Sequence, residues 1–108
     1  MLSYSTFREA AESGTITSAD TTRQAISDIQ SKKHLNAFLT VCENEALTHA
    51  EKSDEHFSAN TARLLEGMTI ALKDNISTKG IRTTCASKIL ENFIPVYDAT
   101  IVERMDAH

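Results

Sequence analysis

Apolar side chains recur with helical spacing through most of the N-terminal half of the chain. Thr6 opens a capping-box pattern and Gly14 is a residue type that commonly follows a helix end, so we expect a helix over residues 6–13. Thr17 repeats the start signal, and apolar residues then return every three or four positions. This spacing predicts a second helix over residues 17–33, ending at two lysines that suit the negative end of a helix dipole.

A third helix and a short strand complete the predicted N-terminal half. Residues 43–57 gather small and apolar side chains on one stripe and acidic side chains elsewhere, which is typical of an amphipathic helix. The members of that stripe are Ala46, Ala50, Ser53 and Phe57. Residues 37–41 form a short apolar run that contains Phe, Thr and Val, so we expect a strand there.

The pattern changes in the C-terminal part of the chain. Residues 68–73 alternate bulky side chains with small or polar ones, which predicts a strand. A turn is expected at residues 78–80, and a short helix over residues 87–93. Asp98 is placed to cap a last helix that begins at Ala99.

Composition and charge limit the class of protein. The 108 residues allow one ordinary domain, and 41% hydrophobic with 24% charged residues is the composition of a folded chain. A net charge of −4 without any basic run argues against binding nucleic acid through phosphates, and no apolar run is long enough to span a membrane. Cys42 and Cys85 form no CxxC motif, so we expect ordinary, at least half-buried reduced thiols in a cytoplasmic protein.

Lys73 is the residue that the pattern singles out for chemistry. On the predicted strand it shares a face with Thr69 and Ala71, whose small side chains leave room beside the amine. The alternative is a solvated lysine at a strand end, which is the common situation for lysines. The histidines are expected at the surface without a metal ion, since His49 and His56 are two helical turns apart, roughly 10 Å.

Three stretches of the C-terminal part resemble the amidase signature family. They are residues 65–76 (LEGMTIALKDNI), 78–93 (TKGIRTTCASKILENF) and 97–103 (YDATIVE). The N-terminal part resembles the family more weakly, in residues 14–16 and 35–38. Within the family, the chain is most similar to the glutaminase subunits of tRNA-dependent amidotransferases.

The resemblance implies an α/β fold in which helices cover a mixed sheet. Residues 1–108 would be the N-terminal segment of a single amidase-signature domain. In that domain residues 1–60 would be mainly helical, and residues 61–108 would supply the first strands, the loop of the catalytic lysine and short helices.

The resemblance also implies a mechanism and a role for Lys73. Family members split amides with a Ser–Ser–Lys arrangement in which one serine attacks the carbonyl, the second relays the proton and the lysine is the base. The family pattern Gly-x-Pro-x-x-x-Lys-Asp aligns with Gly67 to Asp74, with Thr69 in place of the proline. A free lysine amine has a pKa of about 10.4, so a lysine base needs an interior position, which we expect for Lys73 in the complete protein.

The resemblance implies components that these 108 residues do not contain. Both family serines lie in segments further along the relatives, so we expect no glutaminase activity from this chain alone. The intact enzyme would take ammonia from glutamine and, with partner subunits B and C, pass it to Glu-tRNA(Gln) using ATP and magnesium. No cofactor is expected in this chain. Another amidase-signature hydrolase and a non-catalytic truncated paralogue that acts as an interaction module are the open alternatives.

Overall fold

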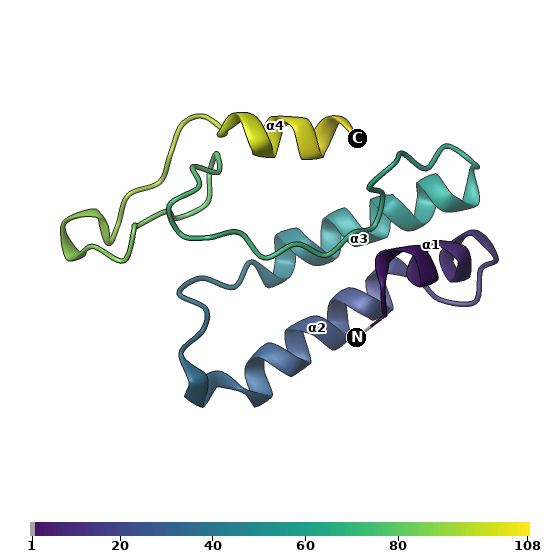
Figure 1. Cartoon of the computed structure of the whole chain (residues 1–108), viewed down its shortest axis with the longest axis horizontal. Coiled ribbons are helices and arrows are strands. Elements are labelled where there is room, and N and C mark those ends of the chain that lie inside the picture. Colours follow the sequence, from purple (N-terminus) through teal and green to yellow (C-terminus); the bar gives the residue numbers. More distant parts are fainter. Residues whose placement is uncertain (1) are drawn as a thin grey trace. The chain divides into compact units, whose positions relative to one another are not determined.

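The computed structural model describes residues 2–108, which divide into two compact units after Thr69. The first unit holds helices α1 (Tyr4–Glu12), α2 (Ser18–Ser31) and α3 (Glu43–Ser58), with a short 3-10 helix, η1 (Lys33–Leu35), after α2 (Figure 1). The second unit holds the 3-10 helix η2 (Lys88–Leu90) and helix α4 (Thr100–Ala107). Within this described stretch, every helix is too short or too polar to cross a lipid bilayer.

The sequence pattern correctly predicts the three N-terminal helices. Thr17 caps α2 as expected, since its hydroxyl oxygen accepts a hydrogen bond from the Asp20 amide at 3.0 Å. Helix α1 begins two residues earlier than predicted, because its cap is Ser3, which accepts a hydrogen bond from the Thr6 amide at 3.2 Å. Gly14 follows the end of α1 with a φ of +72°, a conformation that glycine adopts without strain.

Helices α2 and α3 form an antiparallel hairpin that provides the main helix contact of the first unit (Figure 1). Their buried residues are Ser18, Ala19 and Thr22 of α2, and Ala50 and Ser53 of α3. Such small side chains allow two helices to approach closely, but they bury little apolar surface. Helix α1 adds an aromatic contact, in which the ring of Phe7 meets Phe57 of α3 edge-on with centroids 6.1 Å apart.

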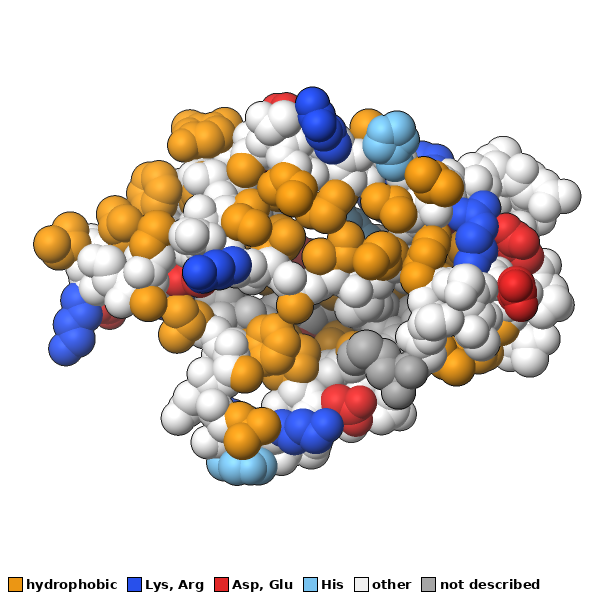
Figure 2. Space-filling model, in the orientation of Figure 1, with side chains coloured by type: hydrophobic (Ala, Val, Ile, Leu, Met, Phe, Trp, Pro, Cys, Tyr) orange, Lys and Arg blue, Asp and Glu red, His pale blue; other side chains and the backbone are white. Residues whose placement is uncertain are grey.

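Neither of the two predicted strands is present among residues 2–108. Residues 37–41 and 68–73 are irregular chain, and the described residues hold a single isolated antiparallel bridge, between Thr78 and Ile81. A strand is stable only when it pairs within a sheet, and this stretch offers no partner strand. The expected mixed sheet is therefore not formed by these residues, and apolar side chains such as Ile70 remain exposed. Figure 2 shows apolar side chains, in orange, at the surface.

The second unit departs from the predicted helices in two places. The turn η2 covers three residues where the pattern predicts a helix over residues 87–93. The Phe93 carbonyl accepts a hydrogen bond from the Thr83 amide at 3.0 Å, so the end of this segment is tied to another part of the unit instead of continuing a helix. Asp98 does not cap α4, because its carboxylate accepts a hydrogen bond from the Lys79 amide at 2.6 Å.

Backbone hydrogen bonds join residues 77–83 to residues 93–99 in the second unit. The donors and acceptors are Gly80 to Pro95 at 3.0 Å, Thr83 to Phe93 at 3.0 Å and Ala99 to Ser77 at 2.8 Å. Pro95, one of these acceptors, has a fully buried side chain. The predicted turn at residues 78–80 is confirmed, since the Ile81 amide donates to the Thr78 carbonyl at 3.1 Å. These bonds give the unit a frame although it has little helix.

We expect Gly67→Ala to destabilise the chain by about 2–4 kcal/mol, and Gly14→Ala by about 1–2 kcal/mol. Both glycines have a φ of +72°, which is strained for alanine. A Cβ at Gly67 would also lie 2.5 Å from Ser18 Oγ and 2.9 Å from Phe7 Cζ, whereas a Cβ at Gly14 meets nothing within 4 Å. Urea unfolding followed by circular dichroism measures both free energies, and equal losses would contradict the steric argument.

Candidate active site around Lys73 and Asp74

Lys73 ends an irregular stretch that leads from the first unit into the second. The amides of residues 70–73 donate to no backbone carbonyl of the described residues, while the Lys73 carbonyl accepts a hydrogen bond from the Ile76 amide at 3.0 Å. The Lys73 side chain is exposed, and no carboxylate between residues 2 and 108 forms an ion pair with it. The Lys73 backbone is thus bonded on its C-terminal side, while its amine is not buried by the described residues.

The next residue, Asp74, accepts hydrogen bonds from three consecutive downstream residues. Its Oδ1 accepts from the Thr84 amide at 2.9 Å, and its Oδ2 accepts from the Thr84 hydroxyl and from the Ala86 amide at 3.1 Å. Its backbone carbonyl accepts from the Cys85 amide at 2.8 Å. We call this set of four hydrogen bonds the Asp74 latch.

The Asp74 latch depends on an ionised carboxyl group. The hydroxyl and amide of Thr84 hold the pKa of Asp74 below its ordinary value. Burial acts in the opposite direction, while the Ala86 amide and the charge of Arg82 lower the pKa further. Asp74 is therefore an anion at neutral pH, and its oxygens are committed to residues 84–86. It serves the structure of the site rather than acting as an acid or a base.

The loop that meets Asp74 has an unusual backbone. Cys85 and Ala86 have φ values of +51° and +54°, which are uncommon for residues with a Cβ. Thr84 is buried, so its hydroxyl would be costly to leave without a partner. The hydrogen bonds to Asp74 satisfy these groups and offset the strain of the turn.

Sequence reasoning singles out Lys73 but misses Asp74 and Thr84. The two latch residues are ten positions apart in irregular chain, where neither helical nor strand periodicity connects them. The available signal was the uncharged run at residues 83–87, whose amides need acceptors outside a helix or sheet.

Glu66 is a buried carboxylate in the first unit, with a side chain 2% exposed. Its Oε1 accepts a hydrogen bond from Ser53 Oγ at 2.6 Å, and its Oε2 lies 2.9 Å from His56 Nδ1 and 3.0 Å from Arg63 Nε. Burial raises the pKa of Glu66, but the hydrogen bonds from Arg63, Ser53 and His56 outweigh it and lower the pKa to about 2. This cluster holds the connection that follows α3.

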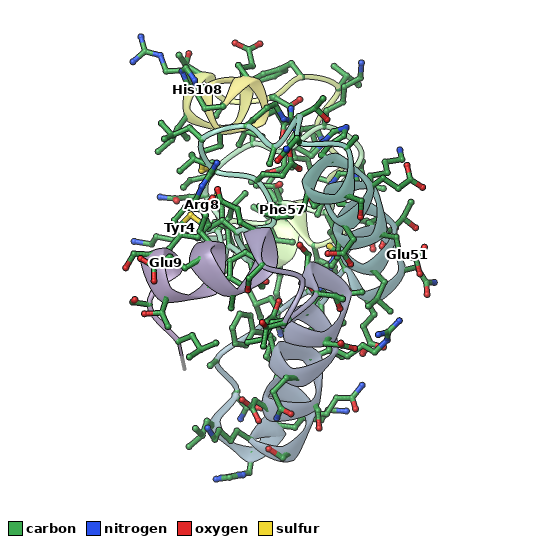
Figure 3. The ribbon with its side chains drawn as sticks, turned by 90° about the vertical axis from the view of Figure 1, so that its right-hand side faces the viewer. Tyr4, Arg8, Glu9, Glu51, Phe57 and His108 are labelled. Carbon is green, nitrogen blue, oxygen red and sulfur yellow. The ribbon has the colours of Figure 1, made fainter. Side chains whose placement is uncertain are left out.

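Helix α1 holds the same connection through backbone carbonyls. The Tyr4 hydroxyl donates to the Leu64 carbonyl at 2.8 Å, and Arg8 Nη1 donates to the Arg63 carbonyl at 2.7 Å. Both donors are labelled on α1 in Figure 3. The chain just before Gly67 is thus fixed from α1 and from α3.

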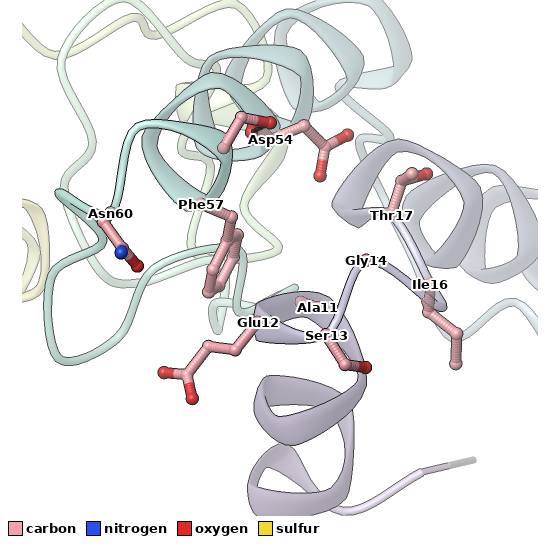
Figure 4. A pocket seen from close by; sticks show the side chains of 10 residues that line it. Ala11, Glu12, Ser13, Gly14, Ile16, Thr17, Asp54, Phe57 and Asn60 are labelled. Atoms are coloured by element: carbon pink, nitrogen blue, oxygen red, sulfur yellow. Dashed lines mark hydrogen bonds between the residues drawn. The ribbon is translucent and has the colours of Figure 1, made fainter.

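A hollow of about 360 Å³ lies in the first unit, between the ends of α1 and α3 and the start of α2 (Figure 4). Its lining includes Asp54, whose carboxylate accepts hydrogen bonds from the amides of Ser18 at 2.6 Å and Ala19 at 3.1 Å. Asp54 therefore acts as a second cap of α2. Lys73 does not line this hollow, so the hollow is not part of the candidate site.

The histidines and cysteines do not extend the candidate site. His34, His49 and His108 are exposed, as predicted for surface histidines, whereas His56 belongs to the Glu66 cluster. Burial raises the pKa of the Cys42 thiol, and Cys85 is exposed rather than half-buried as predicted. Across residues 2–108, no group of three or more His, Cys, Asp or Glu could hold a metal ion.

Comparisons with known proteins agree with the resemblance seen in the sequence. The Amidase family model matches residues 20–108. The chain is 54% identical over 85 residues to the A subunit of the mitochondrial glutamyl-tRNA(Gln) amidotransferase of Anopheles gambiae, covering 78% of this chain and 17% of the relative. It is 44% identical over 104 residues to the A subunit of the Chlorobium phaeobacteroides amidotransferase, covering 95% of this chain and 22% of the relative.

A third relative, the A subunit of the glutamyl-tRNA(Gln) amidotransferase of Archaeoglobus fulgidus, is 54% identical over 74 residues. That match covers 68% of this chain and 16% of the relative. The chain thus spans about a fifth of the length of the curated relatives it matches.

We expect Glu66→Gln to remove the part of the acid-induced loss of stability between pH 4.5 and pH 2 that comes from Glu66. The pKa of Glu66 falls from 4.5 to about 2 on folding, so its stabilisation is complete above pH 4.5 and is lost as the pH falls through 2. The loss in the unchanged chain should be on the order of 2 kcal/mol, because its partners Arg63 and His56 are half exposed.

Urea unfolding at a series of pH values measures this dependence. Glu51→Gln is the matched control, because Glu51 is an exposed carboxylate on α3 (Figure 3). An unchanged pH dependence in Glu66→Gln would contradict the assignment.

Proposed function

This chain belongs to the amidase family, and from that premise we propose that it is the lysine-bearing segment of a glutamyl-tRNA(Gln) amidotransferase A subunit. The observation that carries the proposal is the position of Lys73. It is an exposed amine without an ion-pair partner in residues 2–108, and it directly precedes the fixed residue Asp74. The names of the similar relatives support this choice within the family.

The proposed role of Lys73 is that of a base in a Ser–Ser–Lys mechanism. An uncharged lysine amine takes the proton of a serine hydroxyl, through a second serine, as the first serine oxygen bonds to the amide carbon. The same proton then leaves with the nitrogen as ammonia when the carbon–nitrogen bond breaks. The serines of this scheme would come from other parts of the family domain.

The substrate and the partners are also proposals. Glutamine would be the amide that is split, and the ammonia would pass to Glu-tRNA(Gln) in a complex with subunits B and C that uses ATP and magnesium. Relatives with mitochondrial names stand beside bacterial ones, so the expected cytoplasmic location stays a prediction. A small-amide hydrolase would share the base but would not depend on subunits B and C.

We expect Lys73→Met to lower glutamine hydrolysis by about 10²–10⁴-fold in a hybrid enzyme. In the hybrid, this chain replaces the matching segment of the Chlorobium phaeobacteroides A subunit, assembled with its partner subunits. Lys73→Arg should be equally inactive, since a guanidinium does not give up its proton. Release of ammonia from glutamine is the measurement.

Lys52→Met is the control for loss of one lysine, because Lys52 is exposed on α3, in the first unit. It should leave the rate of the hybrid within about twofold. A Lys73→Met hybrid that is as active as the unchanged hybrid would refute the assignment of the base. Hydrolysis of small amides in preference to glutamine would favour the alternative hydrolase.

We expect the 108-residue chain alone to release no ammonia from glutamine. Within residues 70–108, no serine forms a hydrogen bond with the Lys73 side chain, and a base without a nucleophile performs no acyl transfer. The purified chain is compared with its Lys73→Ala variant. Ammonia release above that variant would show that a nucleophile is present within the chain.

A further inference from the structure

The geometry points to Asp74 and Thr84 as positioning residues for Lys73. This inference rests on the proposed role of Lys73 as the base and adds to it the device that fixes the base in place. Neither residue was selected by the pattern of the sequence. Three features carry it: the lack of bonds before Lys73, the bonds directly after it, and the anchoring of the loop that makes them.

The residues just before Lys73 make no hydrogen bonds of their own within the second unit. There, residues 70–73 donate no backbone hydrogen bond, and their side chains form none. Thr69, whose hydroxyl lies 3.5 Å from that of Thr22, is the last side chain before this stretch with a hydrogen bond. A lysine has a flexible four-carbon stem, so its amine can be placed only as well as its backbone is placed.

The chain directly after Lys73 is held firmly. Four hydrogen bonds of the Asp74 latch connect residue 74 to residues 84–86. Hydrogen bonds to an ionised carboxylate are stronger than those between neutral groups. Because Thr84 is buried, water does not compete easily for its hydroxyl. The fixed point nearest to the amine is therefore the residue that follows Lys73 in the chain.

The loop that forms the latch is itself anchored. The Thr83 amide donates to the Phe93 carbonyl at 3.0 Å, and Arg82 Nη1 donates to the Glu91 carbonyl at 3.1 Å. These bonds tie the loop to the frame around the buried Pro95. The latch thus bonds the backbone next to Lys73 to a loop that is itself held in place, and not to another loose segment.

The latch has a second consequence for a base. A carboxylate next to a lysine favours the protonated amine when the two form an ion pair. Here the Asp74 oxygens accept hydrogen bonds from Thr84 and Ala86. Asp74 and Lys73 form no ion pair with each other. The latch therefore places the amine without binding it to the neighbouring charge, which a proton acceptor requires.

The first test uses the 108-residue chain. Thr84→Val removes the hydroxyl donor and keeps the shape, and Thr84→Ser restores a hydroxyl. Thr83→Val is the matched control, because Thr83 is also buried and its hydroxyl donates to the Ile81 carbonyl at 3.1 Å rather than to Asp74. The measurement is the ¹⁵N heteronuclear NOE of the Lys73 amide, together with hydrogen exchange at Thr84 and Ala86.

Thr84→Val should speed amide exchange at residues 84 and 86 by about tenfold and lower the Lys73 NOE. Thr84→Ser should return both values toward those of the unchanged chain, and Thr83→Val should leave the Lys73 NOE unchanged. If exchange rises at residues 84 and 86 but the Lys73 NOE stays the same, the latch does not position Lys73. Slow exchange in Thr84→Val at both sites would equally overturn the inference.

The second test uses the hybrid enzyme and glutamine hydrolysis. Thr84→Val should lower kcat by about 10²-fold with little change in KM, because a misplaced base affects the reaction and not substrate binding. Thr84→Ser should recover most of kcat. If Lys73→Met abolishes activity but Thr84→Val keeps it, the positioning role is wrong and the base assignment stands. If Lys73→Met stays active, the proposed function itself fails.

Discussion

In each unit, irregular chain is fixed by one carboxylate that accepts several hydrogen bonds. Glu66 collects donors from α3 and from its own connection, and Asp74 collects them from residues 84–86. The two oxygens of a carboxylate can accept about four hydrogen bonds, so one side chain orders groups that neither a helix nor a sheet satisfies. Lys73 lies between these two anchors in the sequence and next to the second.

The helices of the first unit were predictable because their signals are local. Thr17 caps α2 by accepting a hydrogen bond from the amide of Asp20, three residues on. The predicted stripe that includes Ala50 and Ser53 is the face that α3 buries. The second unit was less predictable, since Asp98 directly precedes α4 in the sequence, yet in the folded chain its carboxylate accepts from the distant Lys79 amide. The Asp74 latch is of the same non-local kind.

The absent strands show the limit of local pattern more clearly. Residues 68–73 alternate bulky and small side chains as a strand does. That alternation indicates which side chains would share a face of the strand, but not which other strand would supply its hydrogen bonds. Nothing in residues 2–108 pairs with them, and Ile70 and Leu72 stay exposed. The chain covers about a fifth of the length of its relatives, so the sheet implied by the resemblance would require partners outside these residues.

A lysine base needs both a position and an environment, and the two come from different parts of the protein. The Asp74 latch can give position, because it acts on the backbone next to Lys73 and leaves the amine free of that carboxylate. Environment requires removal of water, and the Lys73 side chain is exposed in this chain. In the proposed enzyme, residues outside this chain would therefore have to cover the amine before it can act as a base.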